Sequence, residues 1–275
     1  MSSMSTSCLV RRTAFVAAIA FMGACDASPP SRSPPSGVAS SGVVAPGPQA
    51  IPKVDVGPEE VDAIVVHTGG AQASDKVPVV VAIHGLGDRP DAFRGLFDGF
   101  PGKARFVFPA GGLPAGGGYS WWPILGRIDE NNVVPGLVAA SERLAGALRK
   151  WQSGAAGKPI VTGFSQGGML SFTLAVRHPE LIAEAVPVAG LVPPTFLPAA
   201  WPEGTPKPRI FALHGSADQR VPFTIAEAGA EKLKALGVPV EFRSYPGVAH
   251  SISPEMRRDL FEAIGAAVDR AAKAN

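Results

Sequence analysis

Short apolar segments alternate with helical periods along the chain beyond Pro52. The segments are four to eight residues long and rich in β-branched side chains, which is typical of strands that are buried on both faces. They span residues 61–66, 77–84, 105–109, 160–163, 185–188, 209–214 and 240–245. Strands and helices in alternation predict an α/β fold with a mostly parallel central sheet covered by helices on both faces.

Apolar residues recur at helical spacing in several stretches that separate or follow the strands. One such stretch covers residues 168–177. In three others the residues that share a face are Leu137, Leu144, Leu148 and Trp151; Ile225, Ala228, Leu233 and Leu236; and Leu260, Ile264 and Val268. Amphipathic helices of this kind bury their apolar face against a sheet. The chain of 275 residues is long enough for one large domain with a well-buried core.

Residues 1–24 have the pattern of a secretory signal peptide. Arg11 and Arg12 precede an apolar run at residues 13–23, which is shorter than a bilayer core requires but suits the central region of an export signal. A twin-arginine signal is a minor alternative because the residues after the arginines fit that pattern poorly, and a buried N-terminal helix is another. We therefore expect an exported protein.

Cys25 closes the apolar run in the sequence M-G-A-C, which resembles a bacterial lipobox. The resemblance implies that Cys25 is lipidated and that the protein is attached to a membrane of the cell envelope; without lipidation it would be periplasmic or secreted. Residues 26–52 contain seven prolines and six serines, and such a segment has too little apolar surface to fold. We interpret residues 25–52 as a disordered tether and residues 53–275 as the folded domain.

The composition argues against several classes of function. Arg11 and Arg12 account for the formal charge of +2, so the remainder is neutral and lacks the basic surface of a nucleic-acid-binding protein. The histidines do not pair at ligand spacing, and Cys8 and Cys25 are the only cysteines, so no metal site is indicated. The sequence has neither a phosphate-binding loop with lysine nor a dinucleotide fingerprint, so no cofactor is expected.

The sequence G-F-S-Q-G at residues 163–167 joins an apolar segment to a helical one. A serine at such a strand–turn–helix junction has a strained backbone that lifts its hydroxyl clear of the sheet. The start of the helix also places unpaired N–H groups beside a developing oxyanion. The pattern predicts that Ser165 is a nucleophile.

A serine hydroxyl needs a base to remove its proton and an acid to orient that base. Among the five histidines, only His250 lies in the loop between the last predicted strand and the last predicted helix. Asp218 follows a predicted strand and lies between Ser165 and His250 in the sequence, in the order nucleophile, acid, base that hydrolases of this kind use. We predict that Asp218 is the orienting acid and that His250 is the general base. The simpler alternatives are a turn aspartate and a solvent-exposed surface histidine without a catalytic role. His214 is interpreted as structural.

The sequence H-G-L-G-D at residues 84–88 follows another predicted strand. Its glycines let the backbone turn so that an N–H group can point at a tetrahedral intermediate. We predict that the N–H groups of Leu86 and Gln166 form an oxyanion hole, in which one donor contributes roughly 3–4 kcal/mol. The alternative is an ordinary tight turn.

Taken in order, H-G-L-G-D, a tryptophan-containing loop, G-F-S-Q-G-G, H-G-S-A-D followed by V-P, and G-V-A-H are similar to motifs of the carboxylesterase and phospholipase family that includes the acyl-protein thioesterases. The resemblance runs from about Val77 to the C-terminus. It implies an α/β-hydrolase fold and hydrolysis of carboxylic esters or thioesters, with the predicted residues in the same roles. Residues 111–123 and 191–208 depart from the family pattern, so the resemblance does not imply a particular substrate.

Trp121 and Trp122 follow a predicted strand in a region where α/β sheets bind ligands. We expect at least one of them to line the substrate cleft. Two rival functions stay open. One is an exported esterase that acts on polymer-linked esters, such as feruloyl, acetyl or hydroxyalkanoate groups; the other is a non-catalytic, lipid-anchored binding protein.

Overall fold

The computed structural model describes residues 60–123 and 130–274. Its main sheet has seven strands in the order β1-β3-β2-β6-β7-β8-β9. Their bounds are β1 Ala63–Thr68, β2 Val79–Ile83, β3 Ala104–Pro109, β6 Ile160–Phe164, β7 Glu184–Val188, β8 Arg209–Gly215 and β9 Val240–Tyr245. Every neighbouring pair is parallel except β1 with β3, which confirms the mostly parallel sheet.

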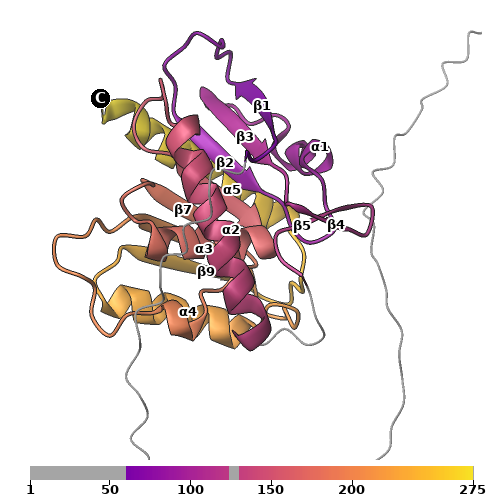
Figure 1. Ribbon diagram of the computed structural model, residues 1–275, viewed down its shortest axis with the longest axis vertical. Helices are drawn as coiled ribbons and strands as arrows, with labels where there is room; N and C mark the ends of the chain where they lie inside the picture. Colours follow the sequence, from indigo (N-terminus) through magenta and orange to yellow (C-terminus); the bar gives the residue numbers. More distant parts are fainter. Residues whose placement is uncertain (1–59, 124–129, 275) are drawn as a thin grey trace, which may run out of the picture. The chain divides into compact units, whose positions relative to one another are not determined.

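Helices cover both faces of this sheet, with α2 on one side of it and α5 on the other (Figure 1). The helical elements are α1 Pro90–Phe93, η1 Arg94–Phe97, α2 Glu130–Trp151, α3 Gln166–Arg177, η2 Pro194–Phe196, α4 Phe223–Ala235 and α5 Pro254–Lys273. One apolar cluster joins the sheet to α2, α3 and α4, and a second joins it to α1, η1 and α5. The predicted α/β architecture is therefore confirmed.

Strand β2 shows how the two clusters share the sheet. Val79, Val81 and Ile83 belong to the cluster with α2, α3 and α4, whereas Val80 and Ala82 belong to the cluster with α5. All five side chains are almost completely buried. A strand buried on both faces has no polar alternation, which is why it appears in the sequence as a continuous apolar run.

Two predictions of detail are wrong. The first strand was expected at 61–66 but lies at Ala63–Thr68, because an exposed edge strand takes its register from its antiparallel partner β3 more than from hydrophobicity. The second prediction concerns helix α4, where Ile225 was expected on the buried face but is 42% exposed. The residues that this helix buries are Ala226, Gly229, Ala230 and Leu233. Small residues face the core here because the helix packs closely: a Cβ on Gly229 would lie 2.8 Å from Val192.

A short hairpin precedes α2 in a stretch that the sequence indicates as a glycine-rich loop. It consists of β4 Leu113–Ala115 and β5 Gly118–Ser120. The two residues between the strands, Gly116 and Gly117, have φ angles of 57° and 86°, which suit a two-residue hairpin turn. This hairpin borders the candidate site described below.

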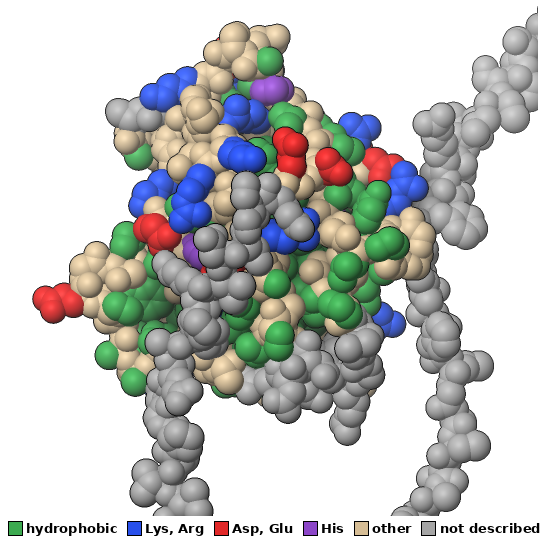
Figure 2. All heavy atoms as spheres, viewed as in Figure 1, with side chains coloured by type: hydrophobic (Ala, Val, Ile, Leu, Met, Phe, Trp, Pro, Cys, Tyr) green, Lys and Arg blue, Asp and Glu red, His purple; other side chains and the backbone are tan. Residues whose placement is uncertain are grey.

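Charged side chains of both signs lie among one another on the face shown in Figure 2, in keeping with the nearly balanced formal charge. None of the helices in the described residues is both long and apolar enough to cross a membrane. The predicted signal peptide, Cys25 and the predicted tether lie outside the described residues.

Candidate active site

Ser165 stands in the sharp turn between β6 and α3. Its backbone has φ 57° and ψ −113°, a conformation that residues other than glycine rarely adopt. Gly163 and Gly167 make this turn sterically accessible, because a Cβ on either residue would overlap the carbonyl oxygen of Ile83 on β2. The sequence folds this way because two glycines let the serine turn pass directly against the neighbouring strand.

His250 lies within hydrogen-bond distance of the Ser165 hydroxyl. Its Nε2 atom is 2.9 Å from Ser165 Oγ, and its Nδ1 atom is 2.7 Å from Asp218 Oδ2. Asp218 follows β8 and His250 follows β9, so all three residues lie at the carboxyl ends of parallel strands, where α/β sheets bind ligands. The structure thus brings together the three side chains predicted from the sequence to act as nucleophile, acid and base.

Asp218 is held as a carboxylate by its surroundings. Burial raises the pKa of this carboxyl, but hydrogen bonds from His214, His250 and the Val221 N–H lower the pKa more, so it stays well below its usual value. The Oδ1 atom accepts the N–H groups of Arg220 (2.9 Å) and Val221 (3.0 Å). One oxygen is therefore fixed by the backbone, and the other faces His250 at 2.7 Å and His214 at 3.4 Å.

The loops that carry Asp218 and His250 are tied to each other. The Ala217 N–H donates to the Val248 carbonyl at 3.0 Å, and a Cβ on Gly215 would overlap that same oxygen. The ring of Phe164 lies against the His250 imidazole with 4.9 Å between centroids. This packing leaves the His250 side chain only 13% exposed and restricts its orientation.

The two predicted oxyanion donors flank Ser165. Gln166 is the first residue of α3, and the first N–H groups of a helix have no acceptor within that helix. Leu86 lies in the turn after β2, next to Gly85, and a Cβ on Gly85 would lie 3.4 Å from Ser165 Cβ. The turn that contains Leu86 therefore runs directly beside the nucleophile turn.

Trp121 and Trp122 are core residues, 5% and 2% exposed. Both belong to the apolar cluster beneath α2 and α3. The prediction that at least one of them lines the substrate cleft does not match this placement, because both indoles are buried. The pair follows β5 directly, and both side chains pack in the core instead of lining a surface.

Other polar residues join this region without having been selected as site residues from the sequence. His214, interpreted there as structural, is 1% exposed; its Nε2 atom lies 2.9 Å from the Val221 carbonyl and 3.4 Å from Asp218 Oδ2. Ser120 is buried and lies 3.1 Å from the amide nitrogen of Gln166. Ser120 could not be found by motif, since its partner is 46 positions away.

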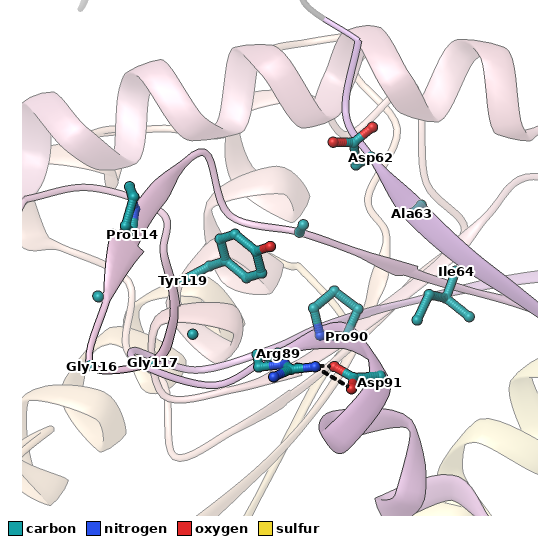
Figure 3. Close-up of a pocket in the computed structure, with 13 residues that line it drawn as sticks. Asp62, Ala63, Ile64, Arg89, Pro90, Asp91, Pro114, Gly116, Gly117 and Tyr119 are labelled. Atoms are coloured by element: carbon teal, nitrogen blue, oxygen red, sulfur yellow. Dashed lines mark hydrogen bonds and ion pairs between the residues drawn. The ribbon is translucent and has the colours of Figure 1, made fainter.

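A cavity of about 890 Å³ is lined in part by residues 114–119 of the hairpin. Tyr119 on β5, the bidentate pair of Arg89 with Asp91, and Asp62 beside β1 contribute to its lining (Figure 3). None of Ser165, Asp218 and His250 lines it. The backbone of Tyr119 nevertheless contacts the turn that holds Leu86, through Gly87 N–H to Tyr119 O at 2.8 Å and Tyr119 N–H to Asp88 O at 2.9 Å.

This strand order, with a serine in a strained turn and a histidine and an aspartate at the ends of later strands, defines an α/β-hydrolase. Residues 66–267 match the phospholipase/carboxylesterase family model. The chain belongs to this family.

The chain is 28% identical over 219 residues to acyl-protein thioesterase 1 of Debaryomyces hansenii, a match that covers 70% of this chain and 93% of that protein. A shorter match to carboxylesterase SOBER1 of Arabidopsis thaliana is 36% identical over 95 residues, or 34% of this chain and 42% of that protein. Among solved structures, esterase PE8 superposes with a TM-score of 0.66 at 26% identity, covering 76% of this chain and all of that one.

Proposed function

We propose that Ser165, His250 and Asp218 act as a catalytic triad, in an enzyme that hydrolyses carboxylic esters or thioesters through an acyl-enzyme on Ser165. The observation that carries the proposal is the continuous line of contacts from Ser165 Oγ through both ring nitrogens of His250 to Asp218. This arrangement moves a proton from the nucleophile while the acid holds the ring in the correct tautomer.

In the first half of the reaction, Ser165 Oγ attacks the carbonyl carbon of the ester as His250 Nε2 takes the hydroxyl proton. The carbonyl oxygen becomes an oxyanion, and the N–H groups of Leu86 and Gln166 stabilise it. His250 then gives the proton to the leaving alcohol or thiol as the bond to the carbonyl carbon breaks. The product of this half is an acyl ester on Ser165.

In the second half, water takes the place of the departed alcohol or thiol. His250 removes a proton from the water, whose oxygen attacks the acyl carbon, and a second oxyanion forms. When this intermediate collapses, the proton returns from His250 to Ser165 Oγ and the carboxylic acid leaves. Asp218 stabilises the imidazolium in both halves without taking its proton.

The substrate class follows from the family and from the residues that hold the reacting carbonyl. The names of the relatives include both carboxylesterases and acyl-protein thioesterases, and a serine triad cleaves either bond by the same steps. In the part of the chain that the structure describes, no feature favours the polymer-linked esters or the non-catalytic role that the sequence left open. We therefore propose carboxylic esters or thioesters as the substrates.

A substrate panel tests this proposal. Purified protein is assayed with p-nitrophenyl esters of increasing acyl length, an acyl thioester, and feruloyl and polyester substrates, beside Ser165→Ala. We expect turnover of soluble esters or thioesters with a burst of the first product, and loss of turnover in the variant. Activity confined to the polymeric substrates would favour the rival enzyme, and wild-type turnover retained in Ser165→Ala would exclude a Ser165 acyl-enzyme.

We also propose export and attachment to a cell-envelope membrane through lipidated Cys25. Support comes from the sequence alone: the arginine pair, the short apolar run and the small residues before Cys25. Expression of the full chain in a bacterium, followed by fractionation and mass spectrometry of the N-terminal peptide, tests this. A cleaved, lipidated Cys25 in the membrane fraction is expected; an unprocessed N-terminus in the cytoplasm would contradict it.

A further inference from the structure

Trp121 contacts both turns that supply the proposed oxyanion donors. Its backbone N–H donates to the side-chain oxygen of Gln166 at 3.1 Å, and its indole N–H donates to the His84 carbonyl at 3.0 Å. Gln166 begins α3 directly after Ser165, while His84 begins the turn that holds Leu86. One residue therefore bridges the nucleophile turn and the turn that runs beside it.

Both of these hydrogen bonds are shielded from water. Trp121 is 5% exposed, Gln166 4% and His84 0%. Breaking a hydrogen bond between buried groups is costly, because the remaining donor or acceptor cannot form a hydrogen bond with water instead. The bridge through Trp121 therefore restricts the relative position of the two turns.

The Gln166 amide is oriented by a second contact, with Ser120. Ser120 Oγ lies 2.5 Å from the Trp122 carbonyl, 3.1 Å from Gln166 Nε2 and 3.2 Å from Gln166 Oε1. Because a hydroxyl has one proton, it donates to the carbonyl and accepts from Nε2. The amide nitrogen of Gln166 is thereby committed to Ser120, and its oxygen is left to accept the Trp121 N–H.

We infer that Trp121 is a positioning residue that fixes the separation of the Leu86 and Gln166 N–H groups. The inference rests on the proposed function and deepens it. Trp121 touches no reacting atom; it acts by holding the two donors in register with the oxyanion. An oxyanion hole tolerates only about 0.5 Å of displacement before transition-state stabilisation falls, so loss of the bridge lowers kcat.

The neighbouring tryptophan provides a matched control. Trp122 is as deeply buried, but its indole N–H has no hydrogen-bond partner among the described residues. Trp121→Phe and Trp122→Phe both remove one ring from the same core cluster, so both are expected to lower the melting temperature. Only Trp121→Phe also removes an indole hydrogen bond to the turn that holds Leu86.

The experiment compares both variants with the wild type on one soluble ester, well below their melting temperatures. For Trp121→Phe we expect kcat to fall about 10- to 100-fold with KM nearly unchanged. For Trp122→Phe we expect kcat within about twofold of the wild type. The affinity of a trifluoromethyl ketone, which forms an oxyanion on the serine, should weaken by the same factor as kcat/KM in Trp121→Phe.

Gln166→Met is the second variant. It keeps the backbone N–H but removes the side-chain oxygen that accepts the Trp121 N–H. We expect kcat to fall by a factor similar to that for Trp121→Phe. In the double variant the fold-loss of kcat should be smaller than the product of the two single fold-losses, because both substitutions break the same bridge.

Equal kcat values in Trp121→Phe and Trp122→Phe, with Ser165-dependent turnover in the wild type, would overturn the positioning role and leave the proposed function intact. A fall in kcat for Trp121→Phe without any loss of trifluoromethyl ketone affinity would also overturn it. Wild-type turnover that persists in Ser165→Ala would instead overturn the proposed function itself.

Discussion

His250 Nδ1 lies 2.7 Å from Asp218 Oδ2, while the other oxygen of Asp218 accepts two backbone N–H groups from its own loop. The carboxylate is thus fixed before it meets the histidine. An acid held in this way selects the tautomer of His250 that carries its proton on Nδ1 and leaves Nε2 free to accept the Ser165 proton.

Asp218→Asn should lower kcat by about four orders of magnitude, because an amide that donates to Nδ1 favours the wrong tautomer. The fold should persist, since the Asn side chain is nearly the same size. Steady-state rates on a soluble ester check this, with Glu227→Gln, an exposed acid on α4, as the control. An Asp218→Asn enzyme within tenfold of the wild type would remove Asp218 from the proposed triad.

Stability in acid should depend on Asp218. Burial raises its pKa, and hydrogen bonds from His214, His250 and Val221 lower it further than burial raises it, so the folded-state pKa lies below the ordinary value of 3.8. This group therefore stabilises the fold above the unfolded pKa, and its contribution is lost as the pH falls below 3.8 toward the folded pKa.

Melting temperatures measured between about pH 6 and about pH 2.5 check this dependence. Asp218→Asn should be less stable than the wild type at the upper end, and the difference should shrink toward the lower end. A constant difference over the whole range would mean that Asp218 has the same pKa in the folded and unfolded chains.

Gly167→Ala should destabilise the protein by about 1–3 kcal/mol, because the new Cβ would overlap the Ile83 carbonyl oxygen and force β2 and α3 apart. Gly146→Ala is the matched control, since this exposed glycine in α2 has nothing within 4 Å of an added Cβ. That substitution should stabilise the helix by up to about 1 kcal/mol. Urea unfolding of both variants measures the difference; equal stabilities would contradict the close approach at Gly167.

The α/β architecture and the three central residues could be predicted from the sequence. Strands buried on both faces leave continuous apolar runs, as β2 does, and the turn around Ser165 leaves glycines at fixed positions. Asp218 and His250 were found because chain order and strand ends restrict which residues can meet. These features are local, or follow from the order of elements in a parallel sheet.

The supporting contacts could not be predicted, because they join residues far apart in the sequence. Trp121 was expected beside the substrate, yet it lies in the core, where its backbone N–H donates to the Gln166 side chain and its indole N–H donates to the His84 carbonyl. The hairpin β4–β5, which directly precedes Trp121, consists of two three-residue strands, and these are too short for a period-two pattern to appear in the sequence. Ile225 was wrongly expected on the buried face of α4, because the face of this helix that packs most closely on the core carries mainly small residues instead of large apolar ones.

Covalent labelling with a fluorophosphonate tests the central claim most directly. The probe reacts with a serine only where a base activates its hydroxyl and an oxyanion hole holds the phosphoryl oxygen. We predict one adduct per chain, located at Ser165 by peptide mass spectrometry, and none in Ser165→Ala. The claim would be contradicted if Ser165 stayed unlabelled while a known serine esterase in the same tube was labelled.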